Sequence, residues 1–141
     1  MGEGGTLMLK RKIVIVFALL VAVVIGGVLL NAKRVELDSI ATAEIVYIYG
    51  GKNISQELTE EEIQELKSLF DGKRIYRDTP SCGFSEDISI KLDASMTFCI
   101  ARDTCPVIYW KEADRYFKIT EEEQHLLYEL LEKYGVTFPC I

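Results

Sequence analysis

DISIKLD, from Asp87 to Asp93, and MTFCIAR, from Met96 to Arg102, form the stretch that decides the fold. Apolar and polar residues alternate in both segments, which is typical of half-buried β-strands. A three-residue loop between them sets apolar against apolar, whereas a two-residue loop would set Ile90 against Cys99. The sequence therefore predicts an antiparallel hairpin whose facing pairs are Leu92 and Met96, Ile90 and Phe98, Ile88 and Ile100, and Glu86 and Arg102.

A second hairpin is predicted from Val107–Trp110 and Arg115–Ile119, which are separated by a polar turn. The register set by that turn places Ile108 opposite Phe117, with Tyr109 opposite Tyr116.

Three further segments complete the predicted sheet region. AEIVYIY, residues 43–49, is rich in β-branched and aromatic residues and predicts a strand. Gly50 to Asn53 is expected to end this strand, with residues 53–55 forming a turn. Residues 74–77 predict one more short strand.

Two helices are predicted, and both begin with the same capping chemistry. Thr59 with Glu62 and Thr120 with Glu123 each form a capping box, in which the threonine hydroxyl and the glutamate carboxylate bond reciprocally to backbone amides. Gly72 and Gly135 are expected to end the helices. The second helix places His125 on its polar side, so we expect a solvated histidine rather than a catalytic one. The apolar faces consist of Ile63, Leu66, Leu69 and Phe70, and of Leu126, Leu127, Leu130, Leu131 and Tyr134.

This order of elements predicts an α+β fold class over residues 41–141. Its two layers are a mostly antiparallel sheet and two helices packed on one face. The apolar tail VTFPCI, residues 136–141, is expected to pack back onto the sheet rather than to hang free.

Ahead of this domain lies IVIVFALLVAVVIGGVLL, residues 13–30, which contains no charged residue. A helix of this length rises about 27 Å, close to the ~30 Å hydrocarbon core of a bilayer. We therefore predict a cytoplasmic tail at 1–12, a transmembrane helix at 13–30, a stalk at 31–40 and an extracytoplasmic domain at 41–141.

The flanking charges give the orientation. Residues 10–12 are Lys-Arg-Lys, whereas Lys33 and Arg34 are followed at once by acidic residues. An excess of Lys and Arg marks the cytoplasmic side, so the expected localisation is the plasma membrane, single-pass, with the N-terminus inside. A cleaved signal peptide is the rival interpretation, but the apolar run is long for one, and a cut after Ala32 would leave bulky Leu30 where a small residue is preferred.

The outer part of the chain is acidic. From Val35 onward it holds 11 Lys and Arg against 21 Asp and Glu, a net charge of −10. Because such a surface repels phosphate backbones, nucleic acid is excluded as an expected partner. The expected partners are the membrane, through the anchor, and a protein or cell-envelope component.

All four cysteines fall in this outer part, which favours two disulfides in an oxidising compartment. The first hairpin brings Cys82 and Cys105 near one end and turns Cys99 to the opposite face. Of the three connectivities, we therefore predict Cys82 with Cys105 and Cys99 with Cys140. Zinc ligation and redox catalysis are the alternatives, but no C-x2-C pair is present, so no metal and no cofactor is predicted.

Six tyrosine and tryptophan side chains are more than the predicted core requires. Aromatic residues are enriched at interfaces, although packing against the helices is the competing explanation. The predicted binding patch consists of Tyr47, Tyr49, Tyr109, Trp110 and Tyr116, while Tyr76 is left unassigned.

The chain also resembles a class of natural proteins. The basic N-terminus, the apolar anchor and the segments AEIVYIYGG, LTEEE, DISIKL, YFKI and ITEEEQHLLYELLEKYG resemble small single-pass proteins of Gram-positive bacteria for which no activity is known. The resemblance implies a cell-surface setting and a small α+β domain, and it transfers no active site.

Two classes of function remain open. The favoured one is a membrane-tethered binding or regulatory module at the outer cell surface. The alternative is a small cell-envelope enzyme, for example a carboxylate-based hydrolase, whose paired acids would be visible only in the fold. The sequence lacks the usual serine-hydrolase, zinc-protease and phosphate-loop motifs, so no catalytic residue is predicted.

Overall fold

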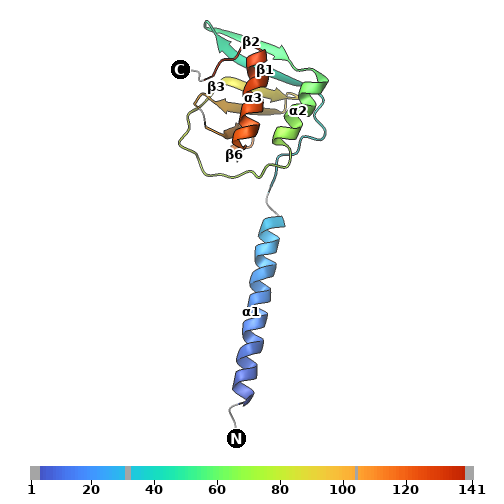
Figure 1. Cartoon of the computed structure of the whole chain (residues 1–141), viewed down its shortest axis with the longest axis vertical. Helices are drawn as coiled ribbons and strands as arrows, with labels where there is room; N and C mark the ends of the chain where they lie inside the picture. The colour runs from blue at the N-terminus through green and yellow to red at the C-terminus, as the bar shows by residue number, and fades with distance from the viewer. Residues whose placement is uncertain (1–3, 31–32, 104, 139–141) are drawn as a thin grey trace. The chain divides into compact units, whose positions relative to one another are not determined.

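The computed structural model describes residues 4–30, 33–103 and 105–138, and the described side chains exclude those of 4–11, 28–30 and 85–86. The chain forms two compact units, Met1–Lys33 and Arg34–Ile141. The first unit contains helix α1 (Gly4–Leu30) (Figure 1). Its large apolar side chains are exposed, among them Ile13, Phe17, Leu20 and Val24.

The structure does not bear out the transmembrane helix predicted over 13–30. Among the described residues, no helix is both long and apolar enough to cross a membrane.

The second unit is an α+β domain with one six-stranded antiparallel sheet in the order β2-β1-β3-β4-β5-β6. Helices α2 (Glu60–Phe70) and α3 (Glu121–Lys133) lie on the same face of this sheet (Figure 1). The predicted α+β class and antiparallel sheet are therefore confirmed. The strands are β1 (Ala43–Tyr49), β2 (Lys52–Glu57), β3 (Phe84–Leu92), β4 (Met96–Ala101), β5 (Val107–Trp110) and β6 (Arg115–Lys118).

Three phenylalanines fill the centre of the core between the helices and the sheet. Phe70 of α2, Phe98 of β4 and Phe117 of β6 are fully buried, and their ring centroids lie 5.2 to 5.6 Å apart. The rings meet edge to face, which is the arrangement their quadrupoles favour. We call the sheet face that carries these rings the helix face, and the opposite one, which carries Cys99, Tyr109 and Tyr116, the distal face.

Both predicted capping boxes are present. The Glu62 amide donates to the Thr59 hydroxyl, and the Glu62 carboxylate accepts the Thr59 amide at 2.8 Å. The same reciprocal pair joins Thr120 and Glu123. Gly135, which follows α3, has φ +91°, a left-handed conformation that glycine adopts without strain.

The predicted hairpin registers are confirmed near their turns. Ile90 faces Phe98 beside the first turn, and the second hairpin has both expected pairs. Beyond Ser89 the first register shifts, so that four residues of β3 (85–88) lie opposite Ile100 alone before Phe84 pairs with Ala101. The predicted pair of Ile88 with Ile100 is therefore wrong, because a bulge lengthens one strand relative to the other. Arg102 forms an ion pair with Asp87 at 2.8 Å, while the side chain of Glu86 lies outside the described set.

The predicted turn over residues 53–55 is also wrong, because these residues lie within strand β2 (Lys52–Glu57). Gly50 and Gly51 have φ of +58° and +75°, and they make a two-residue hairpin turn. The chain then pairs immediately with β1. This strand has a weak sequence signal because Ile54 is its one large apolar residue.

Residues 74–77 form two isolated bridges rather than a strand, which corrects the prediction for this segment. Tyr76 pairs with Tyr116 through two hydrogen bonds, 2.9 Å and 3.0 Å long. Arg74 bridges to Arg34 on the other side of the segment. The segment therefore covers part of the edge of β6.

Candidate functional site

Three members of the predicted aromatic patch lie away from the distal face. Tyr47 is buried on the helix face, where its hydroxyl donates to the Tyr134 carbonyl oxygen at 2.8 Å. Trp110 packs edge-on against Phe98 with ring centroids 5.8 Å apart. Tyr49, at the end of β1, is 70% exposed. The five predicted residues do not form one surface, because alternate residues of a strand point to opposite faces.

The remaining two, Tyr109 and Tyr116, do come together on the distal face, with ring centroids 4.9 Å apart. Phe84 contacts both rings, at 5.9 Å and 5.5 Å, and Tyr76 lies 6.1 Å from Tyr116. We call Tyr76, Phe84, Tyr109 and Tyr116 the distal aromatic cluster. It is built from three separate segments of the chain.

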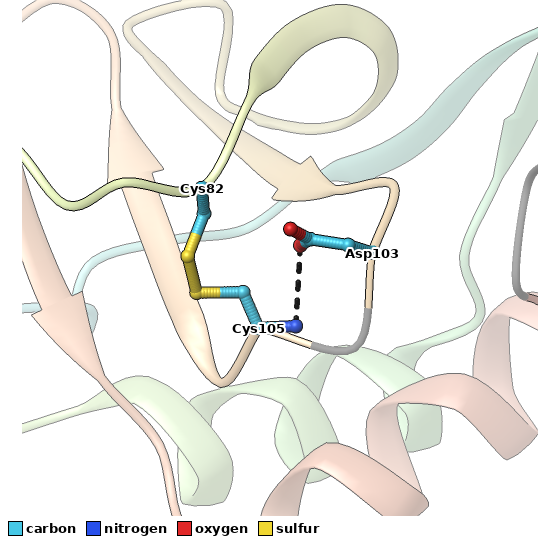
Figure 2. A group of neighbouring side chains, drawn as sticks. All are labelled: Cys82, Asp103 and Cys105. Atoms are coloured by element: carbon cyan, nitrogen blue, oxygen red, sulfur yellow. Dashed lines mark hydrogen bonds between the residues drawn. A yellow bond between two sulfur atoms is a disulfide. The ribbon is translucent and has the colours of Figure 1, made fainter.

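A disulfide fixes the segment that supplies Phe84. Cys82 bonds to Cys105 with a Cα separation of 6.3 Å, which confirms the first predicted pairing (Figure 2). Cys99 is buried in β4, where it pairs across the sheet with Tyr109, whereas Cys140 lies outside the described residues, so the second pairing stays a prediction. A loop of 23 residues is closed by the bond, which stabilises the fold chiefly by restricting the unfolded chain.

Asp103 lies beside this disulfide (Figure 2). Its carboxylate accepts a hydrogen bond from the Cys105 amide at 3.2 Å. The two sulfurs and the carboxylate oxygen fall within 4.8 Å of one another, which is the spacing of metal ligands. Because metals bind cysteine as thiolate, the bonded sulfurs do not supply that ligand set.

A hollow of about 580 Å³ opens beside β6, next to the distal aromatic cluster. Burial, with the nearby Asp78 carboxylate as a second cause, raises the pKa of Tyr76 above its usual range. The Tyr76 hydroxyl is buried and has no hydrogen-bond partner among the described residues. Lys118 places its ammonium 5.9 Å from the centre of the Tyr76 ring. The hollow is lined by Arg74, Tyr76, Asp78, Thr79, Pro80 and Lys118.

A second groove, of about 570 Å³, lies at the turn between β3 and β4. Asp93 has φ +47° there, and its carboxylate accepts the Thr42 amide at 2.7 Å and the Ala41 amide at 3.1 Å. Glu44, also in this groove, accepts from the Ser55 hydroxyl and pairs with Lys91. These bonds lower the pKa of both carboxyls, so Asp93 and Glu44 serve the turn and the strands.

The most buried carboxylate of the described part, Glu62, joins the two helices. It accepts from Lys133 at 2.5 Å and from the Tyr134 hydroxyl, in addition to its cap bonds. These bonds outweigh desolvation and lower the pKa of Glu62 to about 2, while burial and Glu62 raise the pKa of Tyr134 to about 12. With every oxygen occupied, this carboxylate has a structural role.

Two further sequence predictions concern His125 and the C-terminal tail. His125 is exposed on the polar side of α3, 3.3 Å from Glu129, as expected. Of the tail, Val136 is buried and Phe138 stacks on Tyr128 at 4.0 Å between centroids, while 139–141 lie outside the described residues.

No protein family model, curated protein or solved structure matches this chain. The hollow beside β6 was not predicted from the sequence. The segment that lines it is positioned by backbone bridges between residues 40 positions apart, Arg34 with Arg74 and Tyr76 with Tyr116. The one sequence signal was Tyr76, an aromatic residue left over after the core was assigned.

Proposed function

We propose that this protein is a membrane-tethered, extracytoplasmic binding or regulatory module that holds its ligand on the distal face of the sheet. The observation that carries the proposal is the hollow beside β6, bordered by the distal aromatic cluster. Its volume falls in the range of about 300 to 1,000 Å³ that is common for ligand sites. Tyr76 and Pro80 supply apolar surface in its lining, and Arg74, Asp78, Thr79 and Lys118 supply polar and charged groups.

The titration behaviour of the acids favours binding over catalysis. A carboxylate-based hydrolase needs one carboxyl with a raised pKa to act as general acid. Among the described residues, every carboxyl with a shifted pKa is shifted downward, and each is held by hydrogen bonds within the fold. These carboxyls are Glu44, Glu62, Asp93, Glu112 and Glu123.

The tether is proposed from the sequence. Residues 13–30 carry no charge, and the whole run lies within α1. The large apolar side chains of α1 are exposed, and contact with lipid or with another protein would remove them from water. The Cys82–Cys105 disulfide is consistent with an oxidising compartment.

Site-specific photocrosslinking in intact cells tests the binding role. A photoreactive amino acid at Thr79, which lines the hollow, should capture one reproducible partner. The capture should be lost in the Tyr109→Ala variant, which removes a ring of the distal aromatic cluster. It should persist in Tyr49→Ala, which removes an exposed ring elsewhere. Absence of a captured partner, or equal loss in both variants, would refute the proposed binding face.

A further inference from the structure

We infer that the free edge of strand β2 pairs with the same edge of a second copy of the chain, so that two six-stranded sheets join into one. The inference goes beyond the proposed binding function, because β2 and the hollow beside β6 lie at opposite ends of the sheet (Figure 1). It starts from backbone groups that the fold leaves unpaired at this edge.

The register of the β1–β2 hairpin determines which backbone groups of β2 face outward. At the end of this pairing, the Leu58 amide donates to the Ala43 carbonyl oxygen at 2.9 Å. Hydrogen-bonded positions alternate along an antiparallel pair, so the amides and carbonyls of residues 53, 55 and 57 point away from β1. These three residues are exposed, and their backbone groups bond to no other described residue.

The two edges of the sheet differ in how they are protected. Residues 74–77 cover part of the β6 edge through the bridge between Tyr76 and Tyr116. Strand β2 contains no proline, and its pairing with β1 is regular over all six residues. Such an uncovered edge is a template for strand addition. Because only the β2 edge is open along its length in the described part of the chain, pairing through it joins two copies and then stops.

One antiparallel register pairs all of these outward groups. It sets Ser55 of one copy opposite Ser55 of the other, and it sets Asn53 opposite Glu57 on both sides of that centre. The Asn53 amide group is a donor and the Glu57 carboxylate is an acceptor, so these side chains are complementary. A register centred on Ile54 would place Glu57 at the Gly51 turn. A register centred on Glu57 would set two carboxylates against each other, which is unfavourable.

Lys52 gives this register its charge complementarity. Its side chain lies on the helix face, as does that of Ile54, which packs against the core. The register sets Lys52 opposite Leu58 of the other copy, next to the first turn of α2, where Glu60 and Glu61 are exposed. None of these three charged residues forms an ion pair within the described part of the chain. Because each domain carries a net charge of −10, this contact opposes the general repulsion between copies.

A second copy fits this edge better than an unrelated strand. The complementary groups all belong to the segment KNISQE, residues 52–57, and to the helix turn that follows it. Twofold symmetry forms each of these contacts twice. The proposed membrane tether would also confine copies to one surface, which raises their effective concentration.

Cysteine crosslinking of the full chain in uncharged micelles tests the contact and its register. In S55C, the new thiols of two copies face each other, so mild oxidation should give a covalent dimer. N53C and E57C should crosslink when the two variants are mixed, and much less when either is oxidised alone. T79C, with its thiol at the hollow, controls for chance collisions, and the wild type controls for the native cysteines.

Equal dimer yields from S55C and T79C would overturn the inference. Equal yields from mixed and separate N53C and E57C would overturn it as well. A photoreactive amino acid at Ser55, placed in the full chain in cells, should capture a second copy. Capture of a different protein instead would overturn the assignment of the occupant.

Proline at position 55 tests the role of the backbone. S55P removes an outward amide but no hydrogen bond to β1, which is where proline is tolerated in a sheet. Energy transfer between donor-labelled and acceptor-labelled chains is followed as the micelles are diluted. S55P should weaken association about ten-fold or more, whereas S55A, which loses only the hydroxyl that donates to Glu44, should stay within about two-fold. Equal association of the two variants would overturn the inference.

A charge exchange gives a test that does not depend on the folding of S55P. K52E should weaken association about five-fold or more, and K52E/E60K/E61K should restore it. K111E, which changes the same charge at the turn between β5 and β6, is the matched control and should have little effect. Failure of the triple variant to restore association would overturn the inference. S55P should still capture the Thr79 crosslinking partner, so failure of either proposal leaves the other standing.

Discussion

The ammonium group of Lys133, in the last turn of α3, donates to the buried carboxylate of Glu62 on α2 at 2.5 Å. Glu62 is 5% exposed and also caps its own helix through Thr59. One carboxylate therefore joins the start of α2 to the end of α3. The Tyr134 hydroxyl is a further donor to it.

We expect Glu62→Gln to lower the free energy of unfolding by about 2 kcal/mol, because a neutral amide replaces a buried acceptor of several hydrogen bonds. Urea unfolding of the full chain in uncharged micelles, followed by the fluorescence of Trp110, measures this change. Glu61→Gln is the matched control, since Glu61 is exposed on the same helical turn. Equal effects of the two substitutions would contradict the role given to Glu62.

The same carboxylate predicts a pH dependence. The folded pKa of Glu62 is about 2, below the ordinary value of 4.5. The contribution of Glu62 to stability is therefore complete above the unfolded pKa and is lost as the pH falls toward the folded value. Unfolding free energies of the wild type should fall more steeply than those of Glu62→Gln between about pH 5 and about pH 3. Parallel profiles would show that Glu62 is not the responsible group.

Reduction of the Cys82–Cys105 bond should destabilise the domain by about 3 kcal/mol, the loop-closure value for 23 residues. Urea unfolding with and without a dithiol reductant measures the loss, and mass spectrometry of non-reduced peptides identifies the linked pair. In C82S/C105S, any remaining effect of reductant would come from the predicted pair of Cys99 with Cys140. A peptide linking Cys82 to another cysteine would contradict the structure.

Gly135→Ala should destabilise the domain by about 1 to 2 kcal/mol. The residue has φ +91°, and an added Cβ would lie 3.1 Å from the Tyr47 hydroxyl oxygen. Gly83→Ala is the control, because a Cβ there meets nothing within 4 Å and the backbone conformation is ordinary. Thermal unfolding of both variants distinguishes them, and equal melting temperatures would show that the conformation of Gly135 is not required.

The features that the sequence predicted correctly depend on short-range chemistry. The capping boxes at Thr59 and Thr120 are complete within four residues, and the register of the second hairpin follows from its turn. The partner of Cys82 could be predicted because one hairpin brings it close to Cys105. Each prediction needed only the geometry of a single turn or hairpin.

The features that escaped prediction depend on contacts between distant segments. Strand β2 is polar apart from Ile54, so its pairing with β1 is visible only once the Gly50-Gly51 turn is known. The bulge in β3 leaves no trace in the alternation of Ile88 and Ile90. The hollow depends on the pairing of Tyr76 with Tyr116, which side-chain periodicity does not specify.

The central claim is that the sheet domain is displayed outside the cell while the chain stays attached to the membrane. Protease added to intact cells, with fragments detected by tags at each end, tests it most directly. The account predicts that the domain is digested without opening the cells, while the N-terminal tag stays protected in the membrane fraction. Digestion of the domain only after cell lysis, or an N-terminal tag in the soluble fraction, would contradict it.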